Sequence, residues 1–182
     1  MQNKYIWIFI VMAMIATMIF GNKKARLSLV IREQSKIFKN AKNQRISLWD
    51  YCCFLIFPII VSLIIVYKLN ININVNLAEL LTTVFSIVFT VLFGFAAILI
   101  SKIDSQNEIE QQVAKETFVS IVSSTILSLI AAIFSIILTQ INKKSFLQII
   151  SIIVLSISFI LIMLLLLITK RTFILYINNK DN

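Results

Sequence analysis

Apolar runs without a single charged residue recur along this sequence, and they restrict the fold more strongly than any other feature. They cover residues 5–20, 51–67, 80–100, 117–140 and 146–169. In hydrocarbon the backbone must satisfy its own hydrogen bonds, so such runs form helices. The chain is 59% hydrophobic with a mean hydropathy of +0.95, whereas soluble domains are about 45–50% apolar. The sequence therefore predicts an all-α helical bundle that is integral to a membrane.

The first run is the shortest, and whether it is retained or cleaved decides the number of transmembrane helices. As a helix, residues 5–20 reach ~24 Å, whereas the hydrocarbon core is about 30 Å thick. A cleaved signal peptide is the alternative, but only Lys4 precedes the run, and the main positive cluster follows it. We expect a retained anchor over residues 1–21 and about five transmembrane helices, with four as the alternative.

A basic segment, residues 22–50, separates the first run from the other four. At 100° per residue its apolar side chains gather on one helical face, while cations gather on the opposite face. Those cations are Arg32, Lys36, Lys39 and Lys42. We expect a cytoplasmic amphipathic arm that ends near Asn43 and rests on anionic membrane lipid. The alternative is docking of a cytosolic protein or nucleoprotein. Direct nucleic-acid binding is not expected, because the arm lacks repeated aromatic residues on which bases stack.

Charge asymmetry predicts how the chain crosses the membrane. With the N-terminus outside, thirteen Lys and Arg residues fall on the cytoplasmic side and four fall outside. Cytoplasmic loops carry the excess of positive charge, so the N-terminus is expected outside and the C-terminus inside. A four-span core, residues 51–171, with both ends inside satisfies the rule equally. The expected location is the bacterial inner membrane, with a cytoplasmic loop at 101–116 and a cytoplasmic tail at 172–182.

The second run contains the only proline of the chain, Pro58. Proline removes an amide donor and frees the Phe54 carbonyl, so a kink is expected. Cys52 and Cys53 stand at the cytoplasmic end of this run, and their adjacency suits neither an ordinary disulfide nor a zinc site. We interpret them as small apolar fillers.

Two connecting segments have recognisable patterns. From Asn70 to Asn76, Asn alternates with Ile or Val in a strand-like manner, but a lone strand has no partner, so an extended external loop is expected. Ser105 and Glu108 have the spacing of a capping box, which predicts a helix from there to about Gln140.

Small and hydroxyl side chains recur at spacings of three and four residues along the third and fourth runs. They include Ser86, Thr90, Gly94 and Ala97 on the third run, and Ser120, Ser124, Ser128 and Ser135 on the fourth. Small residues let helix backbones approach closely in lipid, so the two stripes are expected to face each other. A hydroxyl-lined pore, formed when copies assemble into a homo-oligomer, is the alternative.

Several function classes are disfavoured by what the sequence lacks. It contains no His, which removes the commonest general base and metal ligand. No ionisable residue lies inside a run, although coupled transporters usually need one at mid-depth. We therefore expect no catalytic, cofactor-binding or metal site, and no enzyme activity.

Short motifs along residues 46–175 bear a likeness to a known group of proteins. Besides the basic arm, they are residues 47–51 (SLWDY), 93–95 (FGF), 115–117 (KET) and 167–171 (LITKR). In this layout the chain resembles small membrane proteins of bacterial anti-phage systems, namely the Kiwa membrane subunit and the membrane effectors of retrons. The resemblance transfers no functional residue. It implies a partner encoded nearby and a role in sensing infection or damaging the envelope.

Two hypotheses for function follow. The first is a membrane sensor or effector of an antiviral defence system that acts with a cytosolic partner and whose spans assemble into a homo-oligomer. The second is a stand-alone small protein that forms a pore or assists an export machine.

Overall fold

The computed structural model describes residues 27–37, 48–103, 108–141 and 144–180, together with the isolated positions 10, 13 and 17. Within these ranges every regular element is a helix, and the predicted all-α class is confirmed. Four helical stretches are long and apolar enough to cross a membrane: Leu48–Lys68, Val75–Ile100, Gln111–Leu138 and Lys144–Ile174. The chain is therefore a multi-pass membrane protein. The predicted first span lies almost wholly outside the described residues.

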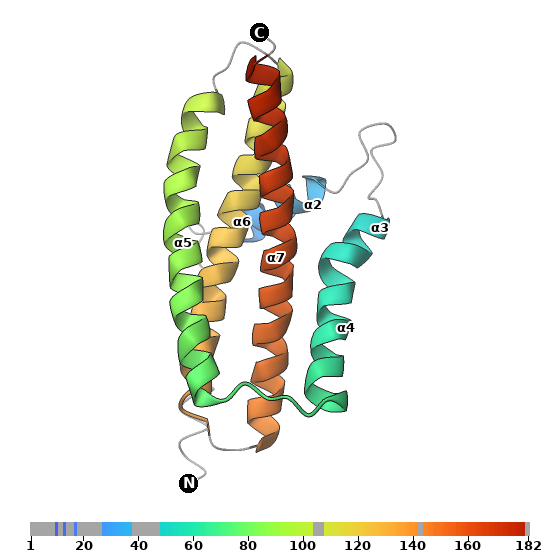
Figure 1. Cartoon of the computed structure of the whole chain (residues 1–182), viewed down its shortest axis with the longest axis vertical. Coiled ribbons are helices and arrows are strands. Elements are labelled where there is room, and N and C mark those ends of the chain that lie inside the picture. The colour runs from blue at the N-terminus through green and yellow to red at the C-terminus, as the bar shows by residue number, and fades with distance from the viewer. Residues whose placement is uncertain are drawn as a thin grey trace.

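Three long helices form the body of the protein, with the middle one in contact with both others. They are α5 (Val75–Ile103), α6 (Glu108–Leu138) and α7 (Lys144–Lys180). The remaining span packs against α7 (Figure 1). α6 lies between α5 and α7, and it is the most deeply buried of the four spans. α7 continues past Lys170, because Lys and Arg end an apolar run without disfavouring helix. The described part of the predicted tail is thus a continuation of α7.

The span around Pro58 is a composite of α- and π-helical turns. It consists of α3 (Leu48–Tyr51), η1 (Cys52–Ile56), α4 (Phe57–Leu63) and η2 (Ile64–Lys68). Wider turns absorb the hydrogen bond that a proline cannot make, as is common in membrane helices. The Phe57 amide donates to the Cys52 carbonyl five residues back, and the Ser62 hydroxyl donates to the Pro58 carbonyl at 2.8 Å.

The predicted external loop has no regular secondary structure over residues 70–74, with Asn70 at a positive φ of 54°, and α5 begins earlier than the apolar run suggests. Asn74 caps this helix: its side-chain oxygen accepts from the Leu77 amide at 2.9 Å. Ile73 is buried, and its amide donates to the Ser151 hydroxyl of α7 at 3.3 Å. The loop is thereby fastened across the end of the bundle.

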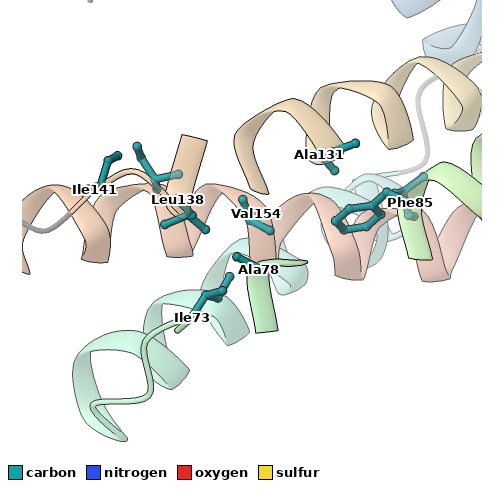
Figure 2. Close-up of a cluster of buried hydrophobic side chains, with 10 residues drawn as sticks. Ile73, Ala78, Phe85, Ala131, Leu138, Ile141 and Val154 are labelled. Atoms are coloured by element: carbon teal, nitrogen blue, oxygen red, sulfur yellow. The ribbon is translucent and has the colours of Figure 1, made fainter. Parts of the chain in front are cut away.

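Two apolar clusters make up the core. The first, near the loop, gathers Ile73, Ala78 and Phe85 with residues of α6 and α7 (Figure 2). The second, toward the other end, gathers Leu92 and Leu99 with residues of α6 and α7. The α5 side chains in these clusters recur every seven residues, from Ala78 to Leu99, which is the spacing of a helix seam.

Candidate functional site: a polar network, a docked arm and two unequal stripes

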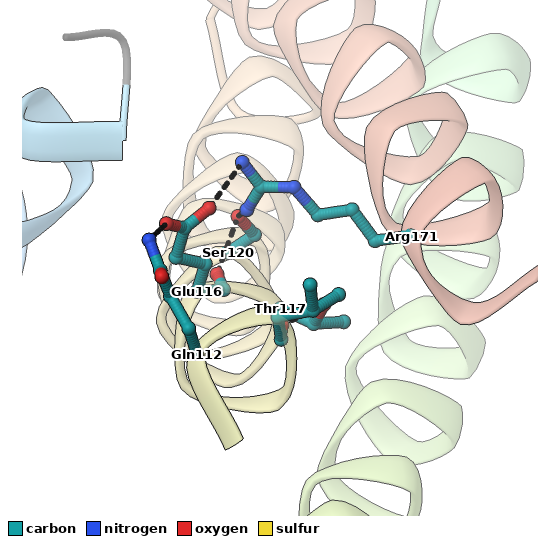
Figure 3. A network of polar contacts seen from close by, with 6 residues as sticks. Gln112, Glu116, Thr117, Ser120 and Arg171 are labelled. Atoms are coloured by element: carbon teal, nitrogen blue, oxygen red, sulfur yellow. Dashed lines mark hydrogen bonds and ion pairs between the residues drawn. The ribbon is translucent and has the colours of Figure 1, made fainter. Parts of the chain in front are cut away.

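A network of polar side chains joins α6 to α7 at the predicted cytoplasmic end. The Arg171 guanidinium lies 3.0 Å from the Glu116 carboxylate, and it donates to the Ser120 hydroxyl at 3.5 Å (Figure 3). The Gln112 amide donates to the other Glu116 oxygen at 3.1 Å. The carboxylate is thus held from both sides.

Burial makes this ion pair contribute more to stability than an ion pair on the surface. The side chain of Arg171 is 14% exposed and that of Glu116 is 35% exposed. Exposed pairs contribute about 0–1 kcal/mol, while removing one partner of a fully buried pair costs about 3–5 kcal/mol. A pair of intermediate exposure lies between these limits. It fixes the relative depth of α6 and α7.

The predicted basic arm contains a helix, α2 (Leu27–Ile37), which packs on α6. Arg32 and Lys36 are exposed, and Lys36 forms an ion pair with Glu33 at 2.6 Å. The other two predicted contact residues, Lys39 and Lys42, lie outside the described residues, as does the predicted end of the arm.

A polar contact fastens α2 to the body of the protein. The Ser123 hydroxyl of α6 donates to the side-chain oxygen of Gln34 at 3.2 Å. Ser123 lies seven residues from Glu116, or ~10 Å along the helix.

The predicted stripe on α6 is fully buried. Ser120, Ser124, Ser128 and Ser135 all have 0% exposure. The first three hydroxyls donate to carbonyls of their own helix, for example Ser124 to Ser120 at 2.8 Å. The Ser135 hydroxyl is buried and has no hydrogen-bond partner among the described residues. Most of these hydroxyl donors are therefore satisfied within α6. For the neighbouring helices, the main property of the stripe is that its side chains are small.

The predicted stripe on α5, unlike that on α6, is exposed. Ser86, Thr90, Gly94 and Ala97 are all exposed, and a Cβ added to Gly94 would meet nothing within 4 Å. The two stripes therefore do not face each other within one chain, contrary to the expectation from spacing. α5 instead turns its larger seam, including Phe85 and Leu92, toward the core, because large side chains bury more apolar area.

Cys52 and Cys53 are half-buried and unbridged in η1. Among the described residues no group of three His, Cys, Asp or Glu side chains is placed to hold a metal ion.

Comparison of the chain with protein-family models, curated proteins and solved structures found no match.

Sequence reasoning missed the residues that make the long-range polar contacts. Glu116 falls in the predicted cytoplasmic loop at 101–116 and Arg171 at the end of the predicted core, although opposite charges at equal predicted depth on consecutive helices are a usable signal. At 100° per residue Gln34 falls on the apolar face of the arm, where a lone amide needs a partner. That partner, Ser123, lies just off the predicted stripe.

Proposed function

We propose that this protein is a membrane component of a bacterial anti-phage defence system, acting in the inner membrane as a sensor or effector together with a cytosolic partner. The observation that supports it best is the seating of α2. The side chain of Gln34 accepts a hydrogen bond from Ser123 of α6, while the side chains of Arg32 and Lys36 on the same helix are exposed. Cations held on a docked helix suit an acidic partner surface, because little ordering entropy is lost on binding.

The defence role itself rests on the resemblance in layout to small anti-phage membrane proteins. It is compatible with a non-enzymatic role, in which partner binding and helix packing replace catalysis. In this proposal the arm receives the partner, and α6 carries the effect to the Glu116 and Arg171 pair.

The test is co-purification with the products of neighbouring genes, combined with phage plating on cells that carry the whole locus. Reversing Arg32 and Lys36 to Glu should abolish both partner recovery and protection. Lys68→Glu, an exposed reversal at the far end of its span, is the matched control and should preserve both. Full protection by a cell that carries the reversed arm would contradict the proposal.

A stand-alone pore is the second candidate, and the exposed stripe on α5 favours it. Copies of the chain assembled through this face would bring Ser86 and Thr90 around a common axis, with hydroxyls able to hold water. Replacing both residues by Val should leave assembly intact but reduce dye entry into cells. Unchanged dye entry would contradict a pore lined by α5.

A further inference from the structure

A cavity of about 380 Å³ separates part of α2 from the helices beyond it. Its walls are mostly apolar, and the residues that line it include Val30 and Ile31 of α2, Leu55 of η1, Ile130 of α6 and Ile160 of α7. Among the described elements, α2 packs closely against α6 alone. Across the cavity, the dispersion contacts of a filled interior are missing. α2 is therefore held along one side only.

The polar contact between α2 and α6 is incomplete. The Ser123 hydroxyl donates to the side-chain oxygen of Gln34 at 3.2 Å, but the Nε2 group of the same amide is buried and has no partner among the described residues. Because this donor is buried, neither water nor a ligand reaches it while α2 is packed on α6. An unpaired buried donor costs more free energy than a single hydrogen bond returns. The bond thus fixes where α2 sits, but the amide as a whole weakens the packing of α2 on α6.

Two other polar contacts of α2 lie within the helix itself. The Ser35 hydroxyl donates to the Ile31 carbonyl at 2.7 Å, and Lys36 pairs with Glu33 at 2.6 Å. Both contacts persist if α2 leaves α6, because both partners of each lie on α2. Release therefore loses mainly the apolar contact with α6, and it frees the Gln34 amide. Elements with few buried contacts open at low free-energy cost.

We propose that α2 is a releasable lid over this cavity. In the seated form, which this structure shows, α2 packs on α6. In the released form the Gln34 amide reaches water, and the α6 wall of the cavity, including Ile130, is uncovered. Both forms are populated, because the unfilled cavity and the unpaired donor offset the apolar contact that favours the seated form. The lid is a property of the single chain and does not depend on the proposed defence role.

Distances between two spin labels test the lid on the full-length protein in lipid nanodiscs. Cys52→Ser and Cys53→Ser remove the native thiols, and Leu29→Cys on α2 and Leu166→Cys on α7 place the labels at exposed positions outside the cavity. We expect two populations of distances, one that matches the seated form and one that does not. A single seated population in this protein and in every variant below would overturn the proposal.

Substitutions on the two sides of one hydrogen bond give the decisive comparison. Gln34→Met removes the unpaired donor together with the bonded oxygen, and the Ser123 hydroxyl is then free to donate to a carbonyl of its own helix. The ratio of seated to released form should rise about fivefold. Ser123→Ala leaves both ends of the Gln34 amide unpaired, so the ratio should fall by a similar factor. If the bond simply stabilised the seated form, both substitutions would lower the ratio, and that result would overturn the proposal.

Filling the cavity tests the contribution of the missing apolar contacts. Ile130→Phe adds apolar volume where α2 lacks contacts, so the ratio of seated to released form should rise. Ile136→Phe, at an exposed position of the same helix, is the matched control and should leave the ratio unchanged. A ratio that Ile130→Phe lowers or leaves equal to that of the control would overturn the proposal, because the cavity would then play no part in the release of α2.

Discussion

Leucine at Ser124 and leucine at Gly94 should have opposite effects, although both positions belong to predicted small-residue stripes. Ser124 is fully buried near the centre of α6, so the larger side chain must displace a neighbouring helix. Overpacking of this kind costs about 1–3 kcal/mol. At Gly94 the added atoms meet open space, so the single chain should be as stable as before.

A conservative variant separates volume from hydrogen bonding. Ser124→Ala removes a hydroxyl that donates at 2.8 Å to the Ser120 carbonyl of its own helix. Polar contacts inside membrane bundles average about 0.6 kcal/mol, so this change should cost less than 1 kcal/mol. The loss of stability in Ser124→Leu can then be attributed to the larger side chain.

The measurement is reversible unfolding in mixed micelles, together with chemical cross-linking in membranes. Ser124→Leu should lower the midpoint of unfolding, whereas Gly94→Leu and Ser124→Ala should leave it near that of the wild type. Ser124→Leu with a wild-type midpoint would refute the packing described for α6. If Gly94→Leu abolishes cross-linked oligomers without changing unfolding, the α5 stripe is the contact between copies.

Three further predictions concern the two ends of the bundle. Arg171→Glu should destabilise the protein by about 1–3 kcal/mol, and adding Glu116→Arg should recover much of this loss, as measured by unfolding of the single and double variants. Asn74→Ala should lower the free energy of unfolding by about 1 kcal/mol, because the α5 cap is lost. Asn76→Ala should leave it unchanged in the same assay, because Asn76 does not cap the helix. A reporter fused after Asn182 should read as cytoplasmic and one inserted at Asn74 as external; an external signal from the C-terminal fusion would contradict the predicted orientation.

Element type and position could be predicted from the sequence because lipid leaves the backbone almost no choice. Each long uncharged run from residue 51 onward is a helix, and their ends lie within several residues of the charges that flank them. The predicted start of the third span is too late for α5, because the apolar run begins at Leu80 whereas the helix cap is Asn74. A helix cap depends on a local hydrogen bond, which a hydropathy pattern does not reveal.

The candidate site was harder to predict, because it depends on how helices are rotated and how deep they sit. Glu116 and Arg171 are 55 residues apart, and each alone resembles an ordinary charge at a membrane boundary. Their pairing follows only when α6 and α7 are placed at a common depth. Similarly, the seat of α2 depends on one amide, Gln34, whose partner Ser123 is distant in the sequence.

The unequal stripes follow from what two facing helices require of each other. Close approach needs small residues on one surface only, provided that the other surface fills the space. α6 supplies the small residues, and α5 supplies Phe85, Leu92 and Leu99, which cluster with small α6 residues such as Ala114 and Ala131. Turning the α5 stripe inward as well would leave two flat surfaces with little to interdigitate, and the dispersion contacts of the large side chains would be lost to lipid. The spacing of small residues therefore identifies faces that permit close packing, and the position of the large residues decides which of those faces the single chain uses.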